Sequence, residues 1–374
     1  MKSQLINKKN KFTCDMQRRM QLKWIVLIVI LFVFSLKSFA TEDEQTIKFA
    51  GVDSLINKAV NLFYQKKFDE AFKICDYVIQ KYPENPLGYL GAAGVYHLLM
   101  LNYRVSLYDH KFDSLTYLAI KAGEKAIKKY RNDANAYFVL GASYGFRGLN
   151  RIRKSEWLGA FHDGLKGITN IKKAHKLKKD LYDVYYALGL FYYWKSVKAK
   201  ILTHLGMMKD EREKGIQYLK IAIEKGKLAS LEGKFALIEI YYYEDRYEEA
   251  LKECESLKEK FFDDPTWNYL MAKILGKLSK WEESKTYFVK LLALLDEFPH
   301  KSFSYLAECH YGIAKCAYEM KDYDTAREEL TKALELSNRW DKKREIEGPL
   351  LDFDKVLKRM KILKKQLEKL NQNQ

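Results

Sequence analysis

Apolar and small residues recur at helical spacing from residue 52 onward, and a small residue marks the same position in each successive pair of expected helices. In the first helix of each pair these residues are Ala59, Ala93, Gly141, Gly189, Ile238, Ala272 and Ala314. In the second helix they are Ala71, Ala119, Gly167, Gly215, Ala250, Ser284 and Ala326. The pattern predicts seven helical hairpins, of which Ile238 and Ser284 fit least well.

The spacing inside the hairpins has two values. The two small residues lie 12 apart in four hairpins and 26 apart in the second, third and fourth. Fourteen extra residues divide into seven per helix, which is about two turns or about 10 Å, and the apolar face then returns to register. We therefore expect the hairpins centred on Arg104, Arg153 and Lys200 to have lengthened helices rather than irregular loops.

Two of the first helices and two of the second carry a recognisable motif. The first-helix motif occurs at Tyr137-x2-Leu140-Gly141-x2-Tyr144 and at Tyr185-x2-Leu188-Gly189-x2-Tyr192. The second-helix motif occurs at Ala71, Cys75, Val78 and Pro83, and again at Ala326, Leu330 and Ala333. On these residues the chain resembles the tetratricopeptide-repeat (TPR) family, in a bacterial-type exported form. The resemblance implies an all-α, right-handed α-solenoid of about seven hairpins over residues 41–337, because one hairpin cannot bury its apolar face alone.

The TPR resemblance also implies a binding surface, since in that family the first helices line a concave groove. Carried over to this chain, the groove positions form an aromatic row: Phe138, Tyr186, Tyr193, Phe235, Tyr242, Tyr269, Tyr311 and Tyr318. Tyrosine and phenylalanine offer a large contact area at low entropic cost, which suits peptide or helix recognition. Packing between adjacent first helices is the alternative role. Aromatic residues in place of Lys and Asn argue against a clamp for a C-terminal carboxylate.

The chain after the last hairpin divides into a polar linker, 338–349, and a C-terminal segment, 350–374. In the latter, apolar residues recur at three- and four-residue steps: Phe353, Val356, Met360, Leu363, Leu367 and Leu370. This stripe predicts a helix that caps the last hairpin. A homodimerising coiled coil is the alternative, on fewer than three heptads.

Residues 1–40 have the pattern of a secretory signal peptide: a basic region, an apolar run over 24–36 and small residues ending at Ala40. The run is short for a membrane span, which needs about 20 apolar residues. We expect cleavage near Ala40 and export to the periplasm or cell envelope. An uncleaved N-terminal anchor formed by residues 24–36 is the alternative.

The charge of the chain suggests a second surface. The net charge is +17, and +10 without residues 1–40, which favours acidic partners or anionic lipid head groups. Basic residues gather at the tips of the long hairpins, near Trp157 and Trp194: Arg147, Arg151, Arg153, Lys195, Lys198 and Lys200. This basic edge could contact lipid, nucleic acid or an acidic protein, and the export signal argues against nucleic acid. An ordinary solvated surface is the bland alternative.

Little in the chain points to catalysis. The 374 residues are 48% apolar with only 5 Pro and 19 Gly, which excludes a turn-rich β protein or a disordered chain. Cys75, Cys254, Cys309 and Cys316 form no zinc or disulfide pattern, and Gly141–Gly145 matches a hydrolase motif only inside an expected helix. We expect no enzyme activity, no metal and no cofactor.

The sequence favours an exported adaptor that binds another protein or peptide, in an unknown oligomeric state. The alternatives are docking on a membrane surface or binding a small apolar ligand between the long hairpins.

Overall fold

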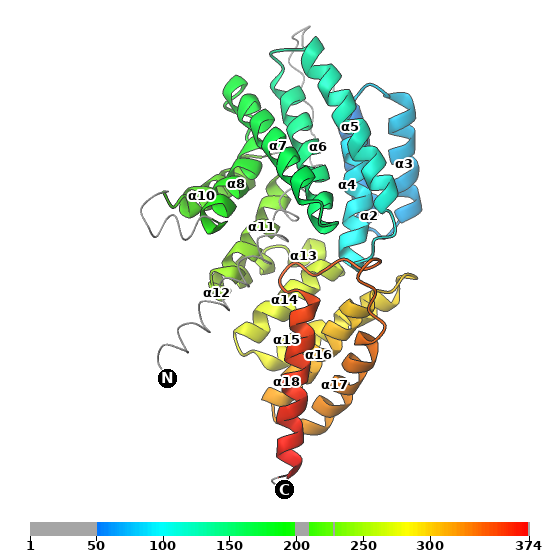
Figure 1. The fold of residues 1–374 in the computed structure, drawn as a ribbon, viewed down its shortest axis with the longest axis vertical. Helices are drawn as coiled ribbons and strands as arrows, with labels where there is room; N and C mark the ends of the chain where they lie inside the picture. The colour runs from blue at the N-terminus through cyan, green and yellow to red at the C-terminus, as the bar shows by residue number, and fades with distance from the viewer. Residues whose placement is uncertain (1–50, 199–208, 227–228, 373–374) are drawn as a thin grey trace. The chain divides into compact units, whose positions relative to one another are not determined.

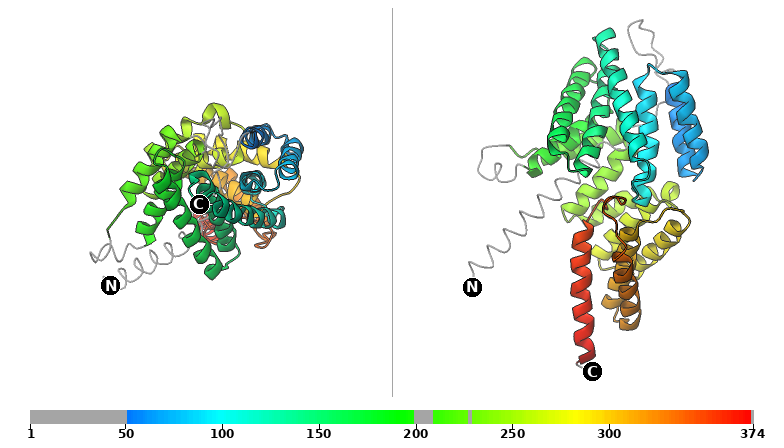
Figure 2. Two further views of the ribbon diagram at one scale, coloured as in Figure 1. Left: turned by 90° about the horizontal axis from the view of Figure 1, so that it is seen from above. Right: turned by 45° about the vertical axis from the view of Figure 1, so that its right-hand side comes forward.

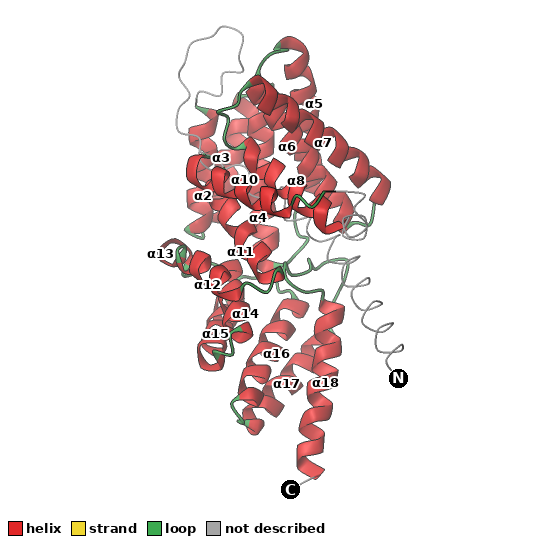
Figure 3. Cartoon of the chain, turned by 90° about the vertical axis from the view of Figure 1, so that its left-hand side faces the viewer, coloured by secondary structure: helices red, strands yellow, loops and turns green. Residues whose placement is uncertain are grey.

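The computed structural model describes residues 51–198, 209–226 and 229–372 (Figure 1). The first described helices are α2 (Val52–Tyr64), α3 (Phe68–Lys81), α4 (Pro86–Tyr103), α5 (Asp109–Lys129), α6 (Ala134–Arg153), α7 (Trp157–Leu177), α8 (Val184–Lys198) and α10 (Arg212–Lys225). They are followed by α11 (Ser230–Tyr243), α12 (Tyr247–Glu255), α13 (Lys258–Phe261), α14 (Pro265–Lys277), α15 (Trp281–Asp296), α16 (Phe303–Glu319), α17 (Tyr323–Ser337) and α18 (Phe353–Gln372). Within the described ranges the secondary structure is helical apart from one isolated bridge between Val105 and Glu345 (Figure 3). The prediction of an all-α repeat solenoid is confirmed.

The predicted repeat phase is confirmed helix by helix. Every small residue of the pattern lies in the first or second helix of its hairpin, and each is buried. A Cβ atom built on Gly141 would lie 2.9 Å from the backbone oxygen of Gly167, so the two backbones are almost in contact. Ser284 fits the small-residue pattern poorly because it carries a hydroxyl group. The fold accommodates this buried hydroxyl, which donates a hydrogen bond of 2.8 Å to the backbone oxygen of Ala272.

Gly215 offers a direct test of this close approach. A Cβ atom on Gly215 would lie 2.6 Å from the backbone oxygen of Gly189 and 2.7 Å from the backbone nitrogen of Tyr193. Because neither backbone atom can move without shifting a helix, Gly215→Ala should lower the free energy of unfolding by about 1–3 kcal/mol. Gly164→Ala on α7 is the matched control, since nothing lies within 4 Å of its added methyl group. The control should gain up to about 1 kcal/mol from helix propensity. Equal urea midpoints for the two variants would contradict the close-packing explanation.

The lengthening of the second and third hairpins is also confirmed. Helices α6 and α7 have 20 and 21 residues, against 13 and 14 in α2 and α3. Helices α4 and α5 have 18 and 21 residues. In the fourth hairpin, residues 199–208 lie outside the described part of the chain.

The turns between the two helices of a hairpin share a backbone feature. A non-glycine residue with positive φ follows the first helix at Lys66, Arg104, Ser155, Asp245, Ser279 and Lys321. This left-handed residue ends the first helix and lets the chain reverse into the second.

The contacts divide the chain into two compact units. The helices of both can be followed by their colours in Figure 2. Of the described residues, those from 51 to 98 and from 109 to 236 form unit 1, and those from 99 to 108 and from 237 to 372 form unit 2. In unit 1, α6 packs against α7, α5 against α6, and α8 against α10. In unit 2, α14 packs against α15, α15 against α16, and α16 against α17. The ten residues 99–108, at the tip of the second hairpin, therefore belong to the same unit as the C-terminal repeats.

Helix α18 closes unit 2. It packs against α16 and α17, and five residues of its apolar stripe are buried there: Phe353, Val356, Met360, Leu363 and Leu367. The predicted capping helix is confirmed, and the stripe that a coiled coil would use is covered by the chain itself.

The segment predicted as a signal peptide or anchor, residues 1–40, lies outside the described residues. Among the helices that the structure does describe, none is both long enough and apolar enough to cross a membrane.

Candidate functional site

The predicted aromatic row is mostly buried. Six of its eight side chains expose less than a tenth of their surface: Phe138, Tyr186, Tyr193, Phe235, Tyr242 and Tyr269. The expectation that these rings face solvent is wrong at those six positions. Tyr311 and Tyr318 are half-buried, where they pack against the core that α18 completes. A binding role of the row stays a prediction at these two residues.

The physical reason for this burial is that other parts of the chain cover the rings. Tyr193 lies edge-on to Trp194, with ring centroids 4.8 Å apart, and its backbone touches the helix that carries Gly215. Tyr269 is covered by Arg104 from the tip of the second hairpin, whose guanidinium carbon lies 4.2 Å from the ring centroid. In the last repeat, the core that α18 completes partly covers Tyr311 and Tyr318.

The predicted basic edge is largely neutralised within unit 1. Arg147 and Arg151 both pair with the buried carboxylate of Asp163, at 2.7 and 2.8 Å. Arg153 pairs with Asp109, and Lys195 pairs with Glu211. These four cations of the predicted basic edge are therefore engaged by acids of the chain itself, and a binding role of the edge stays a prediction. Lys198 is exposed, and Lys200 lies outside the described residues.

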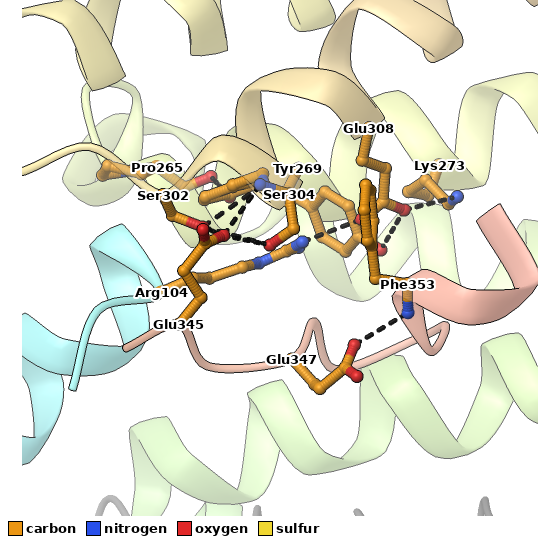
Figure 4. Close-up of polar contacts among 11 residues, drawn as sticks. Arg104, Pro265, Tyr269, Lys273, Ser302, Ser304, Glu308, Glu345, Glu347 and Phe353 are labelled. Carbon is orange, nitrogen blue, oxygen red and sulfur yellow. Dashed lines mark hydrogen bonds and ion pairs between the residues drawn. The ribbon is translucent and has the colours of Figure 1, made fainter. Parts of the chain in front are cut away.

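The most elaborate polar arrangement in the described structure surrounds Arg104 in unit 2 (Figure 4). Arg104 is buried, and its guanidinium group stacks on Tyr305, with 3.5 Å from the guanidinium carbon to the ring centroid. Its Nη1 donates a hydrogen bond of 2.8 Å to Glu308 Oε2. The other carboxylate oxygen of Glu308 accepts from the Tyr269 hydroxyl at 2.9 Å and from Lys273 Nζ at 3.1 Å. The buried carboxylate of Glu308 thus accepts hydrogen bonds from three donors, one at the hairpin tip and two on α14. We call these five residues the Arg104 cluster.

Each charge in the cluster has a partner of opposite sign. Burial alone would raise the pKa of Glu308, but the charges of Lys273 and Arg104 outweigh it and hold the pKa at about 2. Burial raises the pKa of Tyr269 and Tyr305 well above the ordinary value, so both phenols stay neutral. Both cations engage the carboxylate of Glu308, and these contacts hold Arg104 at the hairpin tip against α14 and α16.

The same tip is held at a second point by Asn102. Its side-chain nitrogen donates to Asp264 Oδ2 at 2.7 Å, while Asp264 Oδ1 caps α14 by accepting from the Trp267 amide at 2.9 Å. Burial raises the pKa of Asp264 to about 6 in spite of these donors.

Part of the predicted polar linker 338–349 is a buried strap in the structure. Glu345 Oε2 accepts hydrogen bonds from Ser302 and from the amide and hydroxyl of Ser304, at 2.6–2.8 Å, at the start of α16. The Ile346 amide donates to the backbone oxygen of Arg104 at 2.8 Å. A Cβ atom on Gly348 would lie 2.7 Å from the Arg104 guanidinium carbon, which explains a glycine there. Sequence reasoning missed both the strap and the cluster.

A second group of side chains in unit 2 combines three cations with two tyrosines, and two of the cations, Lys277 and Arg359, have no ion-pair partner among the described residues. Lys273 and Lys277 are four residues apart on α14, so they share one face of the helix. Lys277 Nζ lies 5.8 Å from the ring centroid of Tyr242. Burial, and then the charge of Arg359 on α18, lower the pKa of Lys277, and Arg359 also acts on Tyr311. We call Tyr242, Lys273, Lys277, Tyr311 and Arg359 the cation–tyrosine cluster.

The remaining candidate groups have structural explanations. The four cysteines of the described residues are buried and free. Ser143, in the hydrolase-like motif, lies within α6 and donates its hydroxyl to the Val139 backbone oxygen at 2.7 Å. No group of His, Cys, Asp or Glu within the described ranges is arranged to hold a metal ion.

Comparison with known proteins points to one repeat family. Residues 307–340, which span most of the α16–α17 hairpin, match the family model of the tetratricopeptide repeat. No curated protein matches the chain. Among solved structures, the APC/C hetero-tetramer Cut9–Hcn1 is 16% identical with a TM-score of 0.47, and the match covers 77% of this chain and 47% of that one. The C-terminal part of a TPR repeat-containing protein from Cytophaga hutchinsonii is 19% identical with a TM-score of 0.39, over 75% and 95% of the two chains. A thermophilic TPR protein from Thermus thermophilus is 18% identical with a TM-score of 0.36, over 61% and 99%.

Proposed function

We propose that the chain is a tetratricopeptide-repeat scaffold that binds an acidic segment of another protein, because residues 307–340 match the repeat and such repeats in general serve protein interactions. The cation–tyrosine cluster of unit 2 is the proposed contact. The observation that carries this proposal is that Lys277 and Arg359 have no ion-pair partner within the described residues. Lys277 lies beside the Tyr242 ring, and the charge of Arg359 lowers the pKa of Tyr311 against the larger effect of burial.

The charge around the cluster favours an anionic partner. Glu308 is already engaged by Arg104 and Lys273, so it leaves Lys277 and Arg359 uncompensated. The charge of Asp245 raises the pKa of Lys277, but this effect is smaller than the lowering by burial and by Arg359. Carboxylates of a partner would supply the missing charge, and hydrogen bonds to charged groups are among the stronger ones in proteins.

The tyrosines add contact area to this charge. Tyr242 is nearly covered, whereas Tyr311 on α16 is only half-buried. An aromatic ring beside a cation suits a segment in which acidic and apolar residues alternate, because the ring takes the apolar side chain. The partner class proposed here is therefore an extended or helical segment of that composition. Of the predicted aromatic row, only Tyr242 and Tyr311 belong to the proposed contact.

We also propose that the protein is exported. The basic, apolar and small-residue sequence of residues 1–40 supports export to the periplasm or cell envelope, with an anchor at residues 24–36 as the alternative. N-terminal sequencing of the protein purified from its native cells tests this directly. A mature N-terminus near residue 41 supports cleavage, and an intact Met1 contradicts it.

Binding to the cluster is tested with labelled peptides that alternate Glu with Leu, compared with the same peptides carrying Lys in place of Glu. We expect the acidic peptide to bind more tightly and to lose affinity as salt is added, because exposed charges are screened. Lys277→Glu combined with Arg359→Glu should weaken binding of the acidic peptide at least about tenfold, since both attractive charges become repulsive. Fluorescence anisotropy measures both effects.

The matched control is Lys252→Glu combined with Lys365→Glu, which makes the same change of net charge at two exposed positions of unit 2. This control should bind the acidic peptide nearly as the unaltered chain does. Equal losses in the two double variants would mean that net charge alone attracts the peptide, and the proposed site would be wrong.

A further inference from the structure

One helix of unit 1 exposes a continuous apolar face. On α7 the exposed fractions are 46% for Trp157, 88% for Leu158, 69% for Phe161 and 52% for Leu165. At 100° per residue these four positions fall within one sector of about 100° around the helix axis. Other exposed large apolar residues, such as Val289 and Ile362, stand apart on different helices. Single exposed apolar residues are ordinary, but a contiguous patch usually marks an interaction surface.

The same face of α7 changes from apolar to basic along the helix. Beyond Leu165, the exposed Lys172 and Lys176 lie on this face, and the exposed Lys166 and Lys173 lie farther round the helix. The one acidic residue between 157 and 177 is Asp163, which is fully buried and engaged by Arg147 and Arg151. The exposed surface of α7 is therefore apolar in its first two turns and cationic in its last two.

We propose that this face of α7 docks on an anionic lipid surface. Trp157, Leu158 and Phe161, at the start of the helix, enter the boundary between head groups and acyl chains. Lys172 and Lys176 lie on the same side of α7, about 20 Å or more beyond Leu158 along its axis, and contact lipid phosphates. A tryptophan at the boundary and lysines toward the head groups form the usual composition of an interfacial helix.

A lipid surface fits this face better than a partner helix. Recognition of a helix ordinarily uses a groove that encloses its apolar side. Here the apolar residues lie on one helix at the hairpin tip, and Leu158 is almost completely exposed. A broad, deformable and negatively charged surface matches both these protruding side chains and the absence of exposed acids after Trp157 on α7. This site is independent of the cation–tyrosine cluster, which belongs to unit 2.

The experiment reads out α7 locally, so that membrane binding by residues 24–36 does not mask the result. Leu158→Cys is labelled with an environment-sensitive fluorophore in the full chain carrying Cys14→Ser, because the other four thiols are buried. With vesicles of phosphatidylglycerol and phosphatidylcholine, the emission should shift to shorter wavelength and be quenched by lipids with brominated chains. The same fluorophore at Val289→Cys, an exposed apolar position of unit 2, should stay as it is in water.

The charge requirement is tested on the same labelled chain. Lys172→Glu combined with Lys176→Glu should raise the lipid concentration at half-maximal response roughly tenfold or more, because each basic residue near an anionic surface contributes to binding. Lys121→Glu combined with Lys125→Glu, exposed on α5 at the same spacing, is the control and should leave the response nearly unchanged.

Two results would overturn the proposal. The Leu158→Cys probe could keep its aqueous emission while the chain sediments with vesicles, which would show that other residues hold the membrane. The probe could also shift without lipid as the protein concentration rises, which would assign the face to a second copy of the chain.

Discussion

Replacing Arg104 by methionine will lower the free energy of unfolding by about 3–5 kcal/mol, the usual cost of breaking a buried ion pair from one side. Methionine fills part of the space between Tyr269 and Tyr305 but cannot donate to Glu308. The buried carboxylate then keeps Lys273 and the Tyr269 hydroxyl as partners and loses its strongest donor. Two contacts between the guanidinium group and tyrosine rings are lost as well.

Urea unfolding followed by circular dichroism measures the loss, and hydrogen exchange in α14 and α16 locates it in unit 2. Lys280→Met is the control, because its pair with Glu283 is exposed and contributes little. Glu308→Gln completes a double-mutant cycle with Arg104→Met. A coupling free energy near zero would mean that the Arg104 cluster is a packing contact rather than an electrostatic one.

The repeat phase could be predicted from sequence because it depends on local spacing. The small residues at Gly141 and Gly167 recur at the distance that two packed helices require, and the structure brings their backbones almost into contact. The 14-residue extension is equally local, since seven residues per helix return the apolar face to register. Such features can be predicted from the helical period and the size of single residues alone.

The Arg104 cluster could not be predicted in this way. Arg104 lies about 160 residues from Tyr269 and more than 200 from Glu308, and nothing periodic connects these positions. In the sequence, nothing distinguishes Glu345 from the other polar residues of the linker, although in the structure it is buried against Ser302 and Ser304. One weak signal is present: Glu308 stands among apolar and small residues in the middle of an expected first helix. A carboxylate at such a position needs a cation from elsewhere in the fold.

The predicted exposure of the aromatic row was wrong for a related reason. The family pattern correctly assigns Tyr193, Tyr242 and Tyr269 to first helices, but it does not say what else the chain places against them. In this protein lengthened hairpins, the tip at residues 99–108 and α18 add material that a regular repeat lacks. Exposure depends on these additions, whereas helix assignment does not.

Tyr193→Ala and Tyr242→Ala, made separately, will each lower the free energy of unfolding by about 3–5 kcal/mol, as truncation of a buried aromatic ring usually does. Tyr193 belongs to unit 1 and Tyr242 to unit 2, so each variant reports on one core. Tyr193 is almost completely buried, and Tyr242 lies edge-on to Tyr243 and Tyr247, with ring centroids 6.0 and 5.5 Å apart. Thermal melts of both variants and of the unaltered chain measure the effect.

Tyr117→Ala is the matched control for both variants. Tyr117 is 56% exposed on α5, so its truncation removes little buried surface and should change the stability by less than about 0.5 kcal/mol. If Tyr193→Ala or Tyr242→Ala melted as the control does, that ring would be accessible in solution. The prediction of an aromatic binding surface would then hold at that position, and the burial argument against it would be wrong.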